Sequence, residues 1–252
     1  MTTLTLLTKI SNSDQLNQVH KAVETLLSGL EVEIEILGSV ADGWVQIAFS
    51  GEDEGIAANY VIQEVGLCPS SFENMGEFST LKGYIQKIGK NELTVDVGIF
   101  QPKIVYATVP LRHLQDELVD GRKIAISKIA KLFGFCEGVP VNVKVNGLKG
   151  IKNLIDVKLS SEQIRKYIVW QESLLDRLLV LGPTLREVEA TIEKGRIDRD
   201  VINVEPLGLF ENSLTCKLGT DATGLIPKIG RKLKNARFAV FNPKTLRHFL
   251  SI

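Results

Sequence analysis

Residues 93–98 read Leu93-Thr94-Val95-Asp96-Val97-Gly98. Apolar and polar side chains alternate along this stretch with the two-residue period of a β-strand, and the final glycine is typical of a turn. A similar stretch, Gly83-Tyr84-Ile85-Gln86-Lys87-Ile88, precedes it, and Gly89-Lys90-Asn91 between the two has the composition of a tight turn. We therefore predict two consecutive strands over residues 83–98.

The residues that follow continue the β pattern. We expect a third strand at 104–111, a short helix around Leu114 and Leu118, and another strand at 139–145, where small apolar and polar residues alternate. Short strands broken by glycine turns favour a small closed barrel of five strands. Residues 77–150 are assigned to this barrel domain.

The strands resemble those of S1-type RNA-binding barrels. In that family a Gly-x-Val start, a Val-Asp-Val-Gly second strand and a Val-Pro third strand precede a closing Val-x-Val-x-Val strand. The corresponding stretches here are Gly83-x-Ile85, 95–98, Val109-Pro110 and 141–145, the last as the closing strand. The resemblance implies an S1/OB-like β-barrel that contacts RNA.

The aromatic side chains depart from this pattern. S1 barrels usually present aromatic residues on the second and third strands for base stacking, and the matching strand offers Leu93, Val95 and Val97. We therefore expect affinity for RNA to come mainly from phosphate neutralisation, with Tyr106 or Phe100 stacking on a base where exposed.

Residues 1–76 have the pattern of a compact α+β domain. Apolar strands are expected at 4–10, 31–36 and 45–49, and residues with helical spacing fill 12–29 and 52–66. The predicted order of elements is β-α-β-β-α.

Residues 151–252 are predicted to form a C-terminal α+β domain with a basic tail. Apolar residues from Ile164 to Leu179 predict one helix that ends at Gly182-Pro183, and Thr184 with Glu187 predicts the capping box of a second helix. Strands are expected at the end of the chain, over 201–209, 214–218 and 237–241. The fold class is therefore α+β and multi-domain.

The order of these three regions resembles that of an archaeal family of uncharacterised proteins. The stretches Leu207-Gly208-Leu209 and Gly219-Thr220-Asp221-Ala222 add to the resemblance. It implies the organisation of the chain and no particular activity.

Charge is sorted along the chain, although the net charge is zero. Residues 1–77 carry 12 acidic side chains against Lys9 and Lys21, whereas residues 222–252 carry seven basic side chains and no acid. Such an arrangement indicates a polyanionic partner for the basic part of the surface.

We therefore predict an RNA-binding protein that acts in translation or RNA processing and contacts single-stranded or ribosomal RNA. The bases of residues 77–150, which include Lys90, Lys128 and Lys131, would form one positive surface with the basic tail. The candidate RNA-contacting residues are Lys82, Lys87, Lys103, Tyr106, Arg112, Lys144, Lys228, Arg231, Lys232, Lys234 and Arg237.

Two alternatives remain open. In the first, the protein is a non-catalytic adaptor that docks a basic ribosomal or RNA polymerase subunit through its acidic N-terminal domain. In the second, the small-residue loop 219–224, which precedes Arg231 and Lys232, grips a phosphorylated small molecule as part of an enzyme.

Other classes of site have little support in the sequence. The three histidines lie in no catalytic motif, and Cys68, Cys136 and Cys216 form no Cys-x-x-Cys pair. We expect no catalytic residue, no metal site and no cofactor. The start of the chain lacks the features of a secretory signal and no apolar stretch is long enough for a bilayer, so we expect a cytoplasmic protein without a membrane partner.

Overall fold

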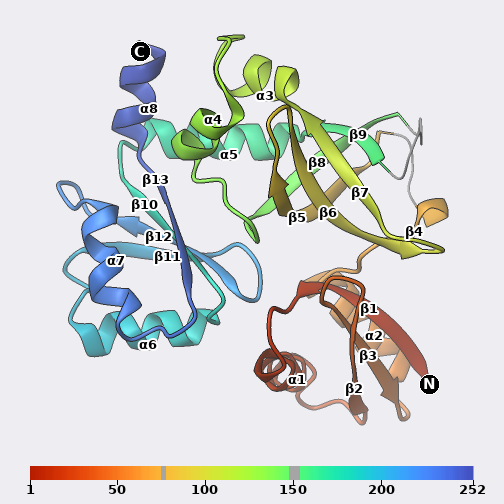
Figure 1. Ribbon diagram of the computed structural model, residues 1–252. Coiled ribbons are helices and arrows are strands. Elements are labelled where there is room, and N and C mark those ends of the chain that lie inside the picture. Colours follow the sequence, from red (N-terminus) through yellow and green to blue (C-terminus); the bar gives the residue numbers. More distant parts are fainter. Residues whose placement is uncertain (75–77, 148–153, 252) are drawn as a thin grey trace. The chain divides into compact units, whose positions relative to one another are not determined.

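The computed structural model describes residues 1–74, 78–147 and 154–251 (Figure 1). The chain forms two compact units. Unit 1 is Met1–Met75 with Gly98–Ile104, and unit 2 is Gly76–Val97 with Val105–Ile252. The division into domains 1–76, 77–150 and 151–252 stays a prediction.

Unit 1 contains a three-stranded antiparallel sheet, in the order β1-β3-β2, and two helices. Its elements are β1 (Thr2–Lys9), α1 (Asp14–Leu26), β2 (Glu33–Val40), β3 (Trp44–Ser50) and α2 (Glu54–Glu64). Val19 and Val23 of α1, and Ala57 and Val61 of α2, are buried at helical spacing. The order is the β-α-β-β-α predicted from the sequence. Two short elements follow, β4 (Ser70–Ser71) and η1 (Phe72–Asn74).

The first part of unit 2 is built around a closed barrel of five strands. The strands are β5 (Thr80–Ile88), β6 (Glu92–Gln101), β7 (Val105–Pro110), β8 (Pro140–Gly147) and β9 (Leu154–Leu159). They pair in the ring β6-β5-β8-β9-β7, and β7 pairs back with β6. Strands β7 and β9 run parallel, which is the OB-type arrangement of five strands. The predicted α+β, multi-domain fold class with a central barrel is confirmed.

The last barrel strand lies later in the sequence than we predicted. Residues 139–145 were expected to close the barrel, but they fall in β8, which is the fourth strand, and β9 is the fifth. The alternation in β9 spans only six residues, Leu154-Ile155-Asp156-Val157-Lys158-Leu159. Such a short run gives a weak sequence signal, and its pairing with both β7 and β8 makes it a strand.

The helices of this region lie between the third and fourth strands and after the fifth. They are α3 (Leu111–Leu118), α4 (Ile126–Phe133) and α5 (Ser161–Glu172). The helix predicted through Leu179 is wrong beyond α5, because the chain turns at Leu174, which has φ +57°, and continues as strand β10 (Arg177–Leu181). All five residues of β10 are buried, and a continuous apolar run of this kind fits a buried strand as well as a helix.

The rest of unit 2 has the order β-α-β-β-α-β, followed by a final helix. The elements after β10 are α6 (Leu185–Gly195), β11 (Val201–Pro206), β12 (Glu211–Cys216), α7 (Ala222–Gly230), β13 (Arg237–Phe241) and α8 (Pro243–Leu250). The antiparallel sheet has the order β11-β12-β10-β13, which is the ferredoxin-like topology. The three predicted strands at 201–209, 214–218 and 237–241 are confirmed within a few residues.

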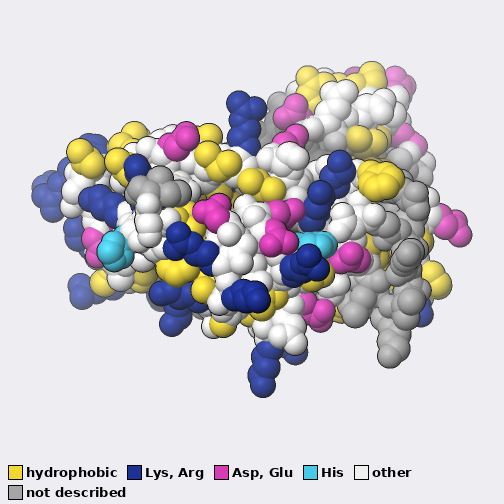
Figure 2. Space-filling model, turned by 90° about the horizontal axis from the view of Figure 1, so that it is seen from above, with side chains coloured by type: hydrophobic (Ala, Val, Ile, Leu, Met, Phe, Trp, Pro, Cys, Tyr) yellow, Lys and Arg dark blue, Asp and Glu magenta, His cyan; other side chains and the backbone are white. Residues whose placement is uncertain are grey.

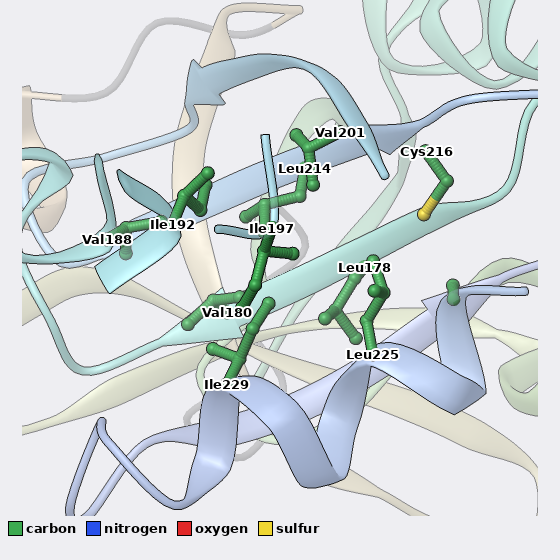
Figure 3. Packing of buried hydrophobic residues seen from close by; sticks show 11 residues of the cluster. Leu178, Val180, Val188, Ile192, Ile197, Val201, Leu214, Cys216, Leu225 and Ile229 are labelled. Atoms are coloured by element: carbon green, nitrogen blue, oxygen red, sulfur yellow. The ribbon is translucent and has the colours of Figure 1, made fainter. Parts of the chain in front are cut away.

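Each face of this sheet packs against different helices. On one face, α6 and α7 bury a cluster with Leu178, Val180 and Leu214 of the sheet (Figure 3). On the other face, Phe241 of β13 lies within 6.2 Å, centroid to centroid, of Phe133 on α4 and Tyr167 on α5. The barrel region and the C-terminal sheet therefore share one core. None of the helices in the described ranges is both long and apolar enough to cross a membrane.

Candidate nucleic-acid interface

The outer surface of the second and third barrel strands offers little for base stacking. Leu93, Val95 and Val97 are fully buried inside the barrel, so the intervening positions, such as Thr94, face outward. On β7 the half-buried Tyr106 alternates with buried neighbours, and the half-buried Phe100 lies near the end of β6. Phe100 belongs to unit 1.

Two lysines face each other on the outside of the barrel. Lys144 on β8 is the direct register partner of Lys158 on β9, and both are half-buried. Like charges directly opposite each other on a sheet are destabilising, and the nearby Glu117 carboxylate offsets part of this repulsion at Lys158. A bound anion would relieve the part that remains. Lys87, at the end of β5, is exposed.

Lys82 has a different environment from the other barrel lysines. Burial lowers its pKa, while the nearby carboxylate of Glu211 on β12 acts in the opposite direction. Glu211 is itself buried, and burial raises its pKa to about 7, partly offset by Lys82. Lys82 therefore lies in the contact between the barrel and the C-terminal sheet, where a nucleic acid has little access.

The two remaining candidates from residues 77–150 lie apart from these lysines. Arg112 is on α3, is largely exposed, and has its Nε 3.8 Å from a carboxylate oxygen of Asp116. Lys103 is exposed but belongs to unit 1. Of the predicted barrel residues in unit 2, Lys82 is the one whose burial beside Glu211 sets it apart from the exposed bases.

The predicted bases of the C-terminal domain lie from the end of α7 to the start of β13. Lys228 forms an ion pair of 3.0 Å with Asp200, and Arg237 lies 3.9 Å from Glu137. Arg231, Lys232 and Lys234 are exposed in the connection. Partial neutralisation of Lys228 and Arg237 leaves these three as the stronger candidates for contact with an anion.

The loop 219–224 is unsuited to holding a phosphate. Its second half is the start of α7, where the Asp221 side chain accepts a hydrogen bond from the N–H of Thr223. The N–H of Ala222 donates to a carboxylate oxygen of Asp176. The backbone donors that would face an anion are thus engaged by two carboxylates, which would repel it.

The folded chain brings together two basic segments that lie far apart in the sequence. Residues 121–136 and 242–251 contain no acidic side chain, and they form α4 and α8 with the adjoining loops. Helix α8 packs against α4 and α5. The resulting surface, which we call the α4–α8 patch, consists of Lys123, Lys128, Lys131, Lys244 and Arg247.

Arg122 ties the C-terminal end of α8 to the loop that precedes α4. Its guanidinium donates hydrogen bonds to the backbone carbonyls of Phe249 and Leu250, at the C-terminal end of α8. It also lies 5.3 Å from the centroid of the Phe249 ring, and the Lys128 ammonium lies 5.8 Å from the same centroid. Arg122 thus satisfies the last carbonyls of α8 and brings its basic residues beside those of α4.

On each helix of the patch, the bases lie on the side away from the core. Helix α4 buries Ile126, Ile129 and Phe133, which leaves Lys128 and Lys131 exposed three residues apart. Helix α8 buries Leu246 and Leu250 among others, and its Lys244 is exposed. Figure 2, seen from the side of α8, shows Lys and Arg side chains spread over this face with single acidic side chains among them.

Solved structures with partial similarity come from archaeal proteins. An uncharacterised protein from Methanocaldococcus jannaschii is 13% identical, with a TM-score of 0.24, over 34% of this chain and 95% of its own. A chain of the a/eIF2alpha–aDim2p–rRNA complex from Pyrococcus horikoshii OT3 is 14% identical, with a TM-score of 0.27, over 61% of this chain and 68% of its own. The intact alpha subunit of aIF2 from Pyrococcus abyssi is 11% identical, with a TM-score of 0.27, over 67% of this chain and 97% of its own.

No curated protein sequence matches the chain. Three domains of one family do match, and together they cover most of its length. They are the DUF2110 N-terminal domain at residues 3–71, the DUF2110 central domain at 75–171 and the DUF2110 C-terminal domain at 175–241. The predicted resemblance to an uncharacterised family of three-part proteins is thereby confirmed. The chain belongs to the DUF2110 family.

Proposed function

We propose that this protein binds RNA without catalysis and that the α4–α8 patch makes most of the phosphate contacts. The observation that carries the proposal is that two acid-free segments, more than a hundred residues apart in the sequence, form one surface of five bases. Collecting like charges costs free energy in the absence of an anion. Phosphate neutralisation with release of counterions offsets that cost.

The barrel extends the contact in this proposal. Lys144 and Lys158 repel each other across β8 and β9, and a phosphate between them would remove the repulsion. With the half-buried Phe100 and Tyr106 as the aromatic side chains of the second and third strands, base stacking contributes little, and the binding is largely independent of sequence.

The kind of RNA and the cellular process are part of the same proposal. We assign the protein to single-stranded or ribosomal RNA, in translation or RNA processing in the cytoplasm. The S1-like strand motifs and the closed five-stranded barrel support this choice, because barrels of this type bind oligonucleotides.

The test is a fluorescence-anisotropy titration of single-stranded and duplex RNA at several salt concentrations. The variant Lys128→Ala/Lys131→Ala/Lys244→Ala removes three bases of the patch. Each phosphate contact on a single strand contributes about −0.7 to the slope of log K against log salt, so the slope should become shallower by roughly 2.

The matched control is Lys194→Ala/Arg199→Ala/Lys217→Ala. It removes the same charge from exposed positions on α6, in the loop before β11 and in the loop after β12. The slope of the control should stay within about 0.5 of the wild-type value, since long-range attraction is screened by salt. Equal losses in the two variants would refute the patch as the binding surface.

An adaptor function is the second candidate, favoured by one observation in unit 1. Strand β2 is at the edge of its sheet and exposes Glu33 and Glu35. A basic protein partner could pair with these carboxylates. In the full-length chain, Glu33→Gln/Glu35→Gln should abolish retention of a basic ribosomal or polymerase subunit and leave RNA affinity unchanged.

A further inference from the structure

A cavity of about 370 Å³ opens between α5 and the C-terminal sheet, within unit 2. Its charged lining residues are Glu162, Arg165, Lys166, Arg177 and Glu205. The three bases exceed the two acids by one positive charge, which favours an anionic ligand. Because the residues come from α5, β10 and β11, the cavity forms only when the sheet packs against the barrel region.

Arg177 is the central group of this cavity. It is 9% exposed, and its Nη1 donates a hydrogen bond of 2.7 Å to the hydroxyl of Thr215. Its Nε is buried and has no hydrogen-bond partner among the described residues. A buried N–H without an acceptor costs free energy, so an oxygen of a ligand at this position would be stabilising.

The carboxylate of Glu205 only partly neutralises the bases. It lies 3.6 Å from the Lys166 ammonium and 3.8 Å from Arg177 Nη1, and both distances exceed those of direct hydrogen bonds. Lys166 and Arg177 also lie 5.0 and 4.8 Å from the centroid of the Trp170 ring. The indole thus holds both cations at the cavity wall, and the donors that Thr215 and Glu205 do not engage stay available to an oxyanion.

We infer that this cavity binds a phosphomonoester, with Arg177, Lys166 and Arg165 around the phosphate. The parallel N–H groups of an arginine guanidinium match the spacing of two phosphate oxygens. A phosphomonoester carries a charge of about −1.5 to −2 at neutral pH. The volume is within the range of small-molecule sites, roughly 300–1,000 Å³, and exceeds the needs of a phosphate alone. The rest of the ligand, of the size of a nucleoside, lies along the exposed Val169.

The ligand can be a free nucleotide or the 5′-phosphate end of an RNA, since both present the same group. The inference does not depend on the α4–α8 patch, which shares no residue with the cavity. A failure of one proposal therefore leaves the other standing.

The test is isothermal titration of the full-length protein with AMP and with adenosine. AMP should bind, and adenosine should bind at least tenfold more weakly. Arg165→Gln, at an exposed position, should lower AMP affinity about tenfold, and Arg186→Gln on α6 should leave it unchanged. Equal binding of AMP and adenosine, or no effect of Arg165→Gln, would overturn the inference.

A second variant tests the buried group. Arg177→Lys keeps the charge but loses the Nε–H, so AMP affinity should fall at least tenfold while the thermal unfolding temperature shows whether the fold is retained. Should this variant unfold, the Arg165→Gln result decides the inference alone. A competition experiment identifies whether the phosphate belongs to an RNA end or to a free nucleotide, with AMP displaced by RNA that carries either a 5′-phosphate or a 5′-hydroxyl. If the 5′-phosphorylated RNA binds more tightly and Arg165→Gln removes the difference, the ligand is an RNA end. If both RNAs bind equally, the ligand is a free nucleotide.

Discussion

Gly83 is a position at which the barrel has no space for a side chain. A Cβ added there would lie 2.5 Å from the carbonyl oxygen of Asp96 and within 2.9 Å of methyl groups of Val95 and Val97. These valines are fully buried, so they have no room to move away. The glycine at the start of the first strand is therefore required by the packing of the second strand.

Replacing Gly83 by alanine should destabilise unit 2 by about 1–3 kcal/mol, the usual cost of overpacking. Urea unfolding measured by circular dichroism checks this value. Gly224→Ala in α7 is the control, because no backbone atom is close to its added Cβ and alanine favours a helix. The two variants having the same stability would contradict the packing argument.

Glu211 makes stability depend on pH. Burial raises its pKa to about 7 from a model-peptide value of 4.5, so the folded protein binds the proton more tightly than the unfolded chain does. The carboxyl group's stabilising contribution is therefore complete below pH 4.5 and is lost as the pH rises through about 7.

The variant Glu211→Gln keeps the size of the side chain and removes the titration. At pH 8 it should be more stable than the wild type, on the order of 1–3 kcal/mol, and at pH 5 the two should be similar. Thermal unfolding at a series of pH values provides the comparison, with the exposed Glu189→Gln as the control. Parallel curves for the wild type and Glu211→Gln would show that Glu211 does not titrate in this range.

At the scale of elements, the N-terminal starts of α5 and α6 follow local sequence closely. Thr184 accepts a hydrogen bond from the N–H of Glu187, and the Glu187 carboxylate accepts one from the N–H of Thr184. The Ser160 hydroxyl likewise accepts a hydrogen bond from the N–H of Gln163, three residues later, and caps α5. These contacts join residues only three positions apart, so no tertiary structure is needed to predict them.

Thr184→Ala should destabilise unit 2 by about 1 kcal/mol, because it removes the capping hydroxyl of α6. Denaturant unfolding measures the loss. Thr223→Ala at the start of α7 is a suitable control, since Thr223 contributes its backbone N–H to the cap of that helix. A loss of equal size in the control would mean that the Thr184 cap adds nothing.

The anchoring of α8 depends on a contact between distant elements. Arg122→Lys keeps the positive charge and removes the fork that reaches the carbonyls of Phe249 and Leu250. Amides of α8 should exchange with solvent about tenfold faster in this variant, and RNA affinity should fall although the net charge is unchanged. Hydrogen exchange followed by mass spectrometry tests this, with Lys123→Arg as the control. Unchanged hydrogen exchange of the α8 amides would show that Arg122 does not anchor this helix.

At the scale of the molecule, the C-terminal sheet is not available for RNA. Four-stranded sheets of RNA-recognition domains stack bases on an open face. Here one face is covered by α6 and α7, and the strands β10 and β12 are buried along their whole length. The basic side chains that remain available lie on the helices and loops around the sheet, which is why the proposed interface is the α4–α8 patch.

The arrangement of the chain also separates bases that are neighbours in the sequence. The seven bases of residues 222–252 suggest one basic tail. In the structure, Lys228 is paired with Asp200 near α6, whereas Lys244 is on α8, beyond the intervening strand β13. The count of charges was a correct description of the sequence and a poor guide to the surface.

The sequence by itself determined those features that arise from contacts along the chain. The alternation at 93–98 predicted a strand, the Thr184–Glu187 spacing predicted a helix start, and the order of elements predicted an α+β protein with a central barrel. Each depends on the local period of side chains and on hydrogen bonds between near neighbours. Such information is present in any short window of residues.

Only the tertiary structure decided which strands close the barrel and which charges share a surface. Strand β9 pairs with β7, some 50 residues earlier, and α8 meets α4 across more than a hundred residues. The burial of Glu211 beside Lys82 likewise needs the barrel and the sheet to pack together. Packing brings together groups that no local period relates, so the sequence could not show which bases share the proposed surface or that Glu211 and Lys82 are buried together.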